Sequence, residues 1–296
     1  MPQPQPAVGL ICGEVRGGNE PVWSVVDLPG LAGVLYSNPC HGASGGDVHY
    51  CSMCNSGIIA RVCLADVAGH GERVAGVARV MHAELRASVN RWDEREVMQA
   101  LDVRLEQSGL KAITTAALDS YRPWKQLLTV SYAGHPPGWI YRAGSDGQGR
   151  RWERLLITES VVSGPADLPL GTGFGPAYSR TRVRALPGDR LLLVTDGVLE
   201  APAPNGTEFG DAGVEGVLSS CVAAGSACAD LASRLIDALR AHTGVDPMEH
   251  DDVSFYVAEI VEPPPGPQVW QTCASARSGR CVTTSAATPQ ARSPAR

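Results

Sequence analysis

The order of the predicted secondary-structure elements constrains the fold of this chain more than any other feature of its sequence. Two helical segments follow one another, several strand-like segments come next in succession, and further helices return only before a last strand. This order differs from the strict alternation of strands and helices that is typical of a doubly wound parallel sheet. Strands that follow one another directly favour antiparallel pairing, so we expect an α+β fold with helices on the outer faces of its sheets.

The individual elements are predicted from hydrophobic spacing and from turn residues. Apolar residues between Val74 and Val89 recur with the helical period. A second helix begins at the N-cap Asp93, with Glu96 as its capping-box partner, and ends at Gly109. Two more helices are expected at about 213–221 and 230–242. Strands are predicted at residues 23–28, 48–53, 58–64, 113–118, 126–133, 138–142, 152–157, 181–185, 190–195 and 253–261.

The composition predicts one folded domain between two poorly ordered ends. With 296 residues, 44% of them hydrophobic, the chain can bury a substantial core. We expect a partly disordered N-terminal extension at 1–20, a folded domain at 21–262, and a disordered tail at 263–296 that is rich in Pro, Ser, Ala and Arg. The tail has four arginines and no acidic residue, so the net charge of −6 leaves −10 for the remainder. An acidic body argues against nucleic-acid binding, which needs a basic face.

The sequence shows no targeting or membrane-spanning segment. The N-terminus, MPQPQPAVGLICGEV, has no basic region, and its apolar part is short and interrupted by glycine and proline. No run approaches the roughly 18 apolar residues that cross a bilayer. We therefore expect a cytoplasmic protein with no membrane partner.

The nine cysteines are irregularly spaced and odd in number, so we expect most of them to be buried free thiols. The alternative is a structural zinc site. Its ligands would come from Cys40, Cys51, Cys54, Cys63, His41 and His49. The pair in C-x-x-C lies in or beside a strand, where a separation of three places the two thiols on opposite faces, and this disfavours zinc.

Four acidic motifs place a carboxylate beside glycine at the end of an apolar strand. They are GGD at Gly45–Asp47, ADVAGHG at Ala65–Gly71, TDG at Thr195–Gly197 and HDDVS at His250–Ser254. Carboxylates from separate strand ends, with glycines that let backbone carbonyls approach, suit hard cations such as Mg²⁺ and Mn²⁺. Each motif alone is weak, because an isolated aspartate at a strand end is more often a turn or cap residue.

Taken in order, these motifs belong to a longer series. It continues with ITTAALD at Ile113–Asp119, YAGHPP at Tyr132–Pro137, LPLG at Leu168–Gly171, GDRLLLVTDGVLEA at Gly188–Ala201, FG at Phe209–Gly210 and DDVSFYVAEI at Asp251–Ile260. The series resembles the bacterial SpoIIE and RsbU type of the protein phosphatase 2C superfamily, across residues 31–261. This resemblance implies a four-layer α-β-β-α sandwich of two mainly antiparallel sheets flanked by helices, with the active site at one end.

The resemblance also implies a metal-dependent serine/threonine phosphoprotein phosphatase with two Mn²⁺ or Mg²⁺ ions. A metal-activated water would attack phosphoserine or phosphothreonine without a covalent intermediate. Asp66 is then the central ligand and a catalytic residue. The implied ligand set consists of the side chains of Asp47, Asp66, Asp196 and Asp251 and the carbonyl of Val67.

Several assignments stay open at this stage. Asp251 and Asp252 are adjacent, and the family pattern favours Asp251. Gly46, Gly69 and Gly71 are expected to permit close backbone approach.

The sequence also leaves open which residue acts as the general acid. Eukaryotic relatives have a histidine at the position of Ala68; His70 is the candidate here, although it fits equally well as a surface residue at the start of the first helix. His135, in a turn, has a structural interpretation as well as a catalytic one.

The partner is implied only by the resemblance. Enzymes of this type act on small signalling phosphoproteins such as anti-sigma-factor antagonists, and a homodimer is one route to regulation. Two other interpretations compete: a catalytically weak pseudophosphatase that acts as a protein-binding module, and a haloacid dehalogenase. The second fails because Val194 occupies the position of the aspartate nucleophile.

Overall fold

The computed structural model describes residues 13–40, 44–53, 58–69, 72–144, 149–160, 164–224, 226–245 and 250–262. The chain divides into two units, Met1–Pro264 and Pro265–Arg296, and every described residue belongs to the first. The tail predicted at 263–296 lies outside the described residues.

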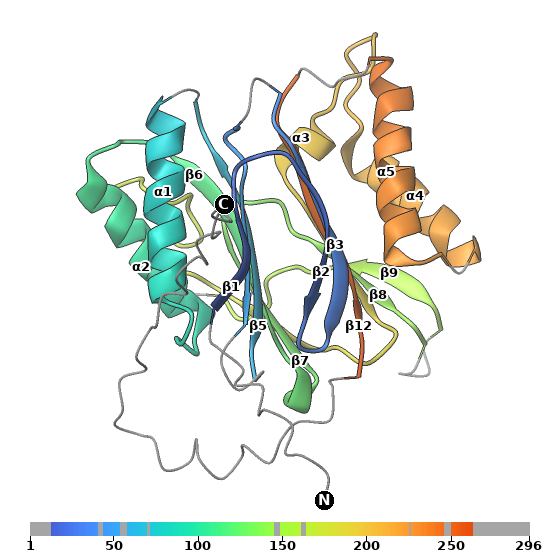
Figure 1. Cartoon of the computed structure of the whole chain (residues 1–296), viewed down its shortest axis with the longest axis horizontal. Coiled ribbons are helices and arrows are strands. Elements are labelled where there is room, and N and C mark those ends of the chain that lie inside the picture. Colours follow the sequence, from blue (N-terminus) through green and yellow to red (C-terminus); the bar gives the residue numbers. More distant parts are fainter. Residues whose placement is uncertain are drawn as a thin grey trace, which may run out of the picture. The chain divides into compact units, whose positions relative to one another are not determined.

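Within the described residues, two six-stranded sheets make up the centre of the fold (Figure 1). The first sheet has the order β1-β4-β5-β6-β7-β10 and the second has the order β2-β3-β12-β11-β8-β9. All pairings between these strands are antiparallel. The first sheet consists of β1 (Gly13–Gly18), β4 (Val48–Met53), β5 (Ala60–Val67), β6 (Thr114–Arg122), β7 (Leu127–Ala133) and β10 (Thr181–Arg184). The second consists of β2 (Val22–Leu28), β3 (Leu31–Asn38), β8 (Trp139–Arg142), β9 (Arg151–Arg154), β11 (Arg190–Val194) and β12 (Val253–Ile260).

Helices cover the outer face of each sheet (Figure 1). The helices α1 (Glu72–Ala87) and α2 (Glu94–Ser108) pack on the first sheet, and α4 (Gly210–Ala224) and α5 (Cys228–Thr243) pack on the second. Two short helices, η1 (Pro123–Lys125) and α3 (Asp196–Leu199), lie in connections. This arrangement confirms the predicted α+β sandwich of four layers. No described helix is long and apolar enough to cross a membrane.

Three apolar clusters lie between the layers, as the alternation along β5 illustrates. Val62 and Leu64 face the core between the two sheets, whereas Cys63 and Ala65 face α1 and α2. Because strand side chains alternate between the two faces, a strand covered on both sides is apolar at nearly every position. A third cluster joins the second sheet to α4 and α5.

The structure adds two strands that sequence reasoning missed, β1 and β3. In β3, Gly33 lies where an added Cβ would be 2.7 Å from the carbonyl oxygen of Val257 on β12. This close approach requires glycine, which weakens the strand pattern in the sequence. The glycines of β1 conceal that edge strand in the same way. By contrast, α2 begins after Asp93, whose carboxylate accepts the N–H of Arg95, and it ends at Gly109, as predicted.

Buried arginines connect the turn between α1 and α2 to the first sheet through hydrogen bonds and an ion pair. Arg61 of β5 donates to the carbonyls of Ser88 (2.9 Å) and Arg91 (2.7 Å). Arg122 of β6 forms a buried ion pair with Glu94, at 2.7 Å. The register pairs Ala60 with Tyr121, so this turn lies at the end of the sheet where β5 begins.

Candidate metal centre

The predicted aspartates meet at the other end of the sandwich, because antiparallel pairing brings the end of one strand beside the start of the next. Asp47 immediately precedes β4, and Asp66 is the penultimate residue of β5. Asp196 follows β11 as the first residue of α3, and Asp251 lies just before β12. Each sheet therefore contributes two of these carboxylates.

Asp66 lies at the electrostatic centre of the group. Burial, followed by the negative charges of Asp196, Asp251 and Asp252, raises the pKa of Asp66 to about 7. Burial also raises the pKa values of Asp196 and Asp251. These carboxylates are close enough to repel one another, and their ionised forms need positive charge.

Asp47 is the most deeply buried of the four predicted aspartate ligands, with 2% of its surface exposed. Its Oδ2 accepts the hydroxyl of Thr195 at 2.9 Å. Its Oδ1 has no hydrogen-bond partner among the described residues, and the nearby hydroxyl of Ser254 donates to Ser37 instead. Burial, together with the charge of Asp66, raises the pKa of Asp47 well above its usual value. An orphaned carboxylate oxygen in such a place is the donor that a cation or its water would satisfy, so the residues fit a hard divalent ion.

The carboxylate of Asp252 makes different contacts from that of Asp251. Its carboxylate accepts the N–H groups of Cys40 (2.7 Å), Gly46 and Asp47 (3.3 Å), and only 6% of the residue is exposed. Asp252 therefore holds the GGD segment in place. Asp251 uses one oxygen to accept the N–H of Asp252 (2.8 Å) and is half-buried. This geometry favours Asp251 as the ligand, an assignment that stays a prediction.

Glycines permit the close approach of these segments, as Gly46 and Gly197 illustrate. A Cβ on Gly46 would lie 2.9 Å from the carbonyl oxygen of Val67 and 3.4 Å from Oδ1 of Asp66. A Cβ on Gly197 would lie 1.9 Å from the carbonyl oxygen of Asp252. Gly69 differs from our expectation, because nothing lies within 4 Å of its Cβ position. Its φ of +118° explains the glycine instead.

The histidines contribute little to the described part of the site. His70 and Gly71 lie outside the described residues. His135 is 5% exposed, and burial lowers its pKa to about 4, so its ring is neutral near pH 7. His250 contacts the carbonyl oxygen of Gly197 through Nε2, at 2.8 Å, and so ties the segment before β12 to α3.

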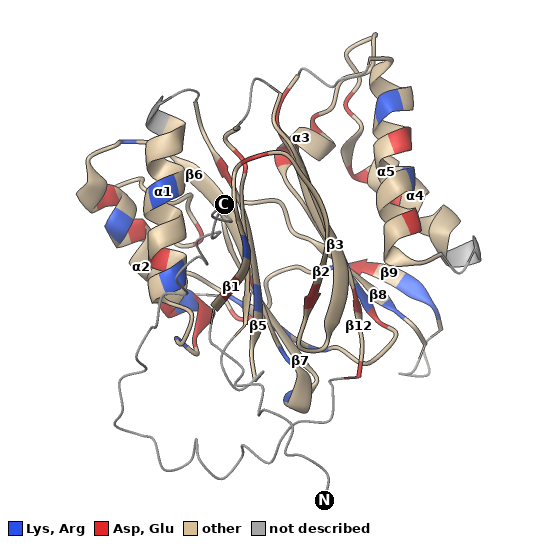
Figure 2. Cartoon of the chain, viewed as in Figure 1, with Lys and Arg blue, Asp and Glu red and all other residues tan. Residues whose placement is uncertain are grey.

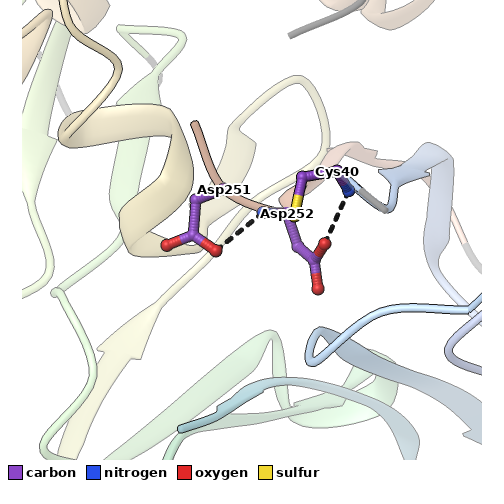
Figure 3. A group of neighbouring side chains, drawn as sticks. All are labelled: Cys40, Asp251 and Asp252. Carbon is purple, nitrogen blue, oxygen red and sulfur yellow. Dashed lines mark hydrogen bonds between the residues drawn. The ribbon is translucent and has the colours of Figure 1, made fainter. Parts of the chain in front are cut away.

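Cys40 is a neighbour of the site that sequence reasoning did not place there. Its Sγ and carboxylate oxygens of Asp251 and Asp252 all lie within 4.8 Å of one another (Figure 3). Burial and a hydrogen bond to Asp252 raise the pKa of this thiol to about 11.

Cys51 and Cys63, two of the candidate zinc ligands, lie in different apolar clusters, on opposite faces of the first sheet. Cys54 and His41 lie outside the described residues.

Comparison with known proteins places the chain in a family. The family model described as "Stage II sporulation protein E (SpoIIE)" matches residues 60–261, more than half of the chain. The chain belongs to the SpoIIE family. This match confirms the predicted relationship, and it includes Asp66, Asp196 and Asp251, whereas Asp47 and Cys40 precede it. No curated protein matched the chain.

Solved structures share the fold of this SpoIIE-family chain. The RsbU and RsbW domains of Rv1364c from Mycobacterium tuberculosis align with a TM-score of 0.63 and 22% identity, over 83% of this chain and 64% of that one. The chain therefore spans less than two thirds of that protein. The SiaA PP2C domain of Pseudomonas aeruginosa aligns with a TM-score of 0.59 and 19% identity, over 76% and 84% of the two chains. The catalytic domain of the phosphatase PstP, in complex with two manganese ions, aligns with a TM-score of 0.53 and 19% identity. The alignment covers 78% of this chain and 98% of that one. At these identities the likeness shows a PP2C-type fold.

Proposed function

We propose that this chain is a metal-dependent protein serine/threonine phosphatase that hydrolyses phosphoserine and phosphothreonine. One observation carries the proposal: aspartates from both sheets converge on Asp66, and none of them forms an ion pair with a described lysine or arginine. Membership of the SpoIIE family supports the same activity. So does the PP2C-type fold, which PstP shares in its complex with two manganese ions.

The donor set suits two Mn²⁺ or Mg²⁺ ions. When bound, such ions would lower the pKa of a water for attack on the phosphorus and would neutralise the phosphoryl oxygens. The carboxylates of Asp47, Asp66, Asp196 and Asp251 would hold them, with the carbonyl of Val67 beside Gly46 as a further donor.

The chain's own residues position these ligands. Thr195 orients Asp47 through its hydroxyl, and Asp252 fixes the backbone of the GGD segment. Ser254 donates its N–H to Oγ1 of Thr195 at 3.1 Å, which links β12 to the start of α3. This network leaves Asp66, Asp196 and Asp251 without a competing side-chain donor among the hydrogen bonds of the described residues.

The proposed substrate is a signalling phosphoprotein such as an anti-sigma-factor antagonist. The support is the likeness to a protein in which RsbU and RsbW domains occur together. The substrate assignment is wrong if the purified chain hydrolyses small phosphoesters but leaves every candidate antagonist phosphorylated.

The test is Mn²⁺-dependent hydrolysis of p-nitrophenyl phosphate by the wild type and by Asp66→Asn and Asp196→Asn. We expect each variant to lose about 10³-fold or more in kcat/KM, because each removes a ligand of the catalytic ions. The matched control is Asp230→Asn, at an exposed position on α5, which should keep wild-type activity.

Calorimetric titration with Mn²⁺ separates the two interpretations of an inactive protein. A wild type that neither binds Mn²⁺ nor hydrolyses the ester would refute the proposal in favour of the protein-binding module. Activity that survives in both ligand variants would show that the metal centre has been misplaced.

A further inference from the structure

A pocket of ≈ 510 Å³ opens at the same end of the first sheet as the metal centre. Its walls come from the end of α2, the segment before β6, and the glycine-rich segment 171–174. We call it the flank pocket. The residues that matter here are Leu105, Lys111, Ala112, Ile113 and Phe174. Ile113 is 50% exposed and Phe174 is 70% exposed, so two large apolar side chains face solvent at one place.

The walls of the flank pocket are held by hydrogen bonds. Asp102 of α2 accepts the N–H of Gly171 at 2.8 Å. Leu170 and Thr114 exchange two backbone hydrogen bonds, at 2.8 and 3.1 Å. A Cβ on Gly171 would lie 2.6 Å from the carbonyl oxygen of Ala112, so the two segments are in contact there. A pocket with walls fixed in this way needs little reorganisation to bind a side chain.

The flank pocket lies beside the metal centre, because the segment before β6 neighbours the end of β5. The carbonyl of Ile113 accepts the N–H of Ala68 at 2.9 Å, and Thr115 pairs with Asp66 across β6 and β5. With about 4.8 Å between strands and about 3.3 Å per residue, Ile113 lies about 8 Å from Asp66. An extended peptide whose phosphorylated residue sits at Asp66 would place a side chain about two to four residues away over the pocket.

We propose that the flank pocket binds an apolar side chain of the phosphoprotein substrate, two to four residues from its phosphorylated residue. This inference rests on the proposed function and names how that site selects its substrate. Lys111 and Glu106 both line the pocket, so their charges balance. The support comes from the exposed apolar side chains of Ile113 and Phe174 beside the metal centre. The flanking side chain fills the apolar wall, while the phosphate lies at the metal centre.

The experiment uses fluorescein-labelled phosphoserine peptides with an Ala/Gly/Ser background. One leucine is moved from position −4 to +4, and an all-alanine peptide serves as reference. Fluorescence anisotropy measures the Kd of each peptide for the full chain, as wild type, Phe174→Ser, Ile113→Ser and the control Val103→Ser. Val103 is exposed on α2 and does not line this pocket. Each leucine peptide is compared with the alanine peptide on the same variant, so general changes in affinity cancel.

We expect leucine to tighten binding to the wild type by about fivefold or more at one or more positions between two and four residues from the phosphoserine. The advantage should fall below about twofold in Phe174→Ser or Ile113→Ser and should persist in Val103→Ser. The proposal is overturned if leucine gives no advantage at any position, or if its advantage survives in both pocket variants. A concentration-dependent dimer that Phe174→Ser abolishes, without any leucine preference, would assign the surface to a second copy of the chain.

Hydrolysis of p-nitrophenyl phosphate by the wild type separates this inference from the proposed function. Hydrolysis without a leucine preference would refute peptide binding in the flank pocket and would leave the proposed phosphatase activity unaffected. A leucine preference that depends on Phe174, in a protein that hydrolyses nothing, would refute the phosphatase and leave a phosphopeptide-binding site.

Discussion

The two ends of the first sheet differ in whether their buried charges are neutralised by an opposite charge of the protein. At the turn between α1 and α2, Arg122 is paired with Glu94, so buried charges are neutralised within the protein. At the other end, Asp47 and Asp66 are repelled by further carboxylates, and acidic segments lie around α3 (Figure 2). Uncompensated buried charge lowers stability. The first end therefore serves the fold, whereas the second has the uncompensated carboxylates that the proposed metal-dependent function requires.

The largest effect on stability is expected at the paired end. Arg122→Met would leave Glu94 buried without its cation and should lower the free energy of unfolding by about 3–5 kcal/mol, measured by urea denaturation. The double variant Arg122→Met/Glu94→Gln should recover part of this loss, since it removes the charge. A loss below about 1 kcal/mol for the single variant would remove the contrast between the two ends.

Mn²⁺ should stabilise the protein through the carboxylate end alone. At 100 times its Kd, a ligand that binds only the folded state adds about 2.7 kcal/mol to the free energy of unfolding. We expect this gain in the wild type and in Asp230→Asn, and a much smaller one in Asp66→Asn, measured by thermal denaturation with and without Mn²⁺. An equal gain in Asp66→Asn would place the ions elsewhere.

Gly46→Ala sharpens the comparison without changing a charge. The new methyl group would lie 2.9 Å from the carbonyl oxygen of Val67, so the GGD segment must shift by a few tenths of an ångström. We expect about tenfold weaker Mn²⁺ binding by calorimetry, because ligand geometry is strict for such ions. Gly216→Ala, on α4 with open space at its Cβ position, is the control. Unchanged binding in Gly46→Ala would mean that the Val67 carbonyl is not a donor.

The last effect concerns pH in the metal-free protein. The pKa of Asp66 is about 7 in the folded state and near 3.8 when unperturbed, so the folded state holds its proton more tightly. The associated stability is present below about pH 4 and is lost as the pH rises to about 7. Asp66→Asn removes this dependence and should raise the stability of the metal-free protein at pH 8, where the wild-type carboxylate is ionised beside other carboxylates. Thermal melts of both proteins between pH 5 and pH 8, with a chelator present, would test this prediction. It would be contradicted if the melting temperature changed equally with pH in the wild type and in Asp66→Asn.

Local signals were enough to predict most of the fold. The strand β4 was predicted at its observed bounds, and α2 was predicted from its caps, because strand alternation, Asp93 and Gly109 are properties of neighbouring residues. The strand β3 was missed because Gly33 is required by the backbone of β12, which lies more than 200 positions away. The site was predicted as four separate aspartates, but the supporting role of Thr195 was not, since its hydroxyl reaches Asp47 only in the folded chain.

The sequence by itself determined the order of the elements, because periodicity is a local pattern, and its motif series carried the resemblance that implied the family and the aspartate ligands. Only the tertiary structure showed what the two adjacent aspartates before β12 contact. Asp252 is occupied by N–H groups from Cys40, Gly46 and Asp47, whereas Asp251 remains open toward Asp66 and Asp196. These donors are separated from Asp252 by 205 to 212 positions, and only folding brings them within hydrogen-bonding distance.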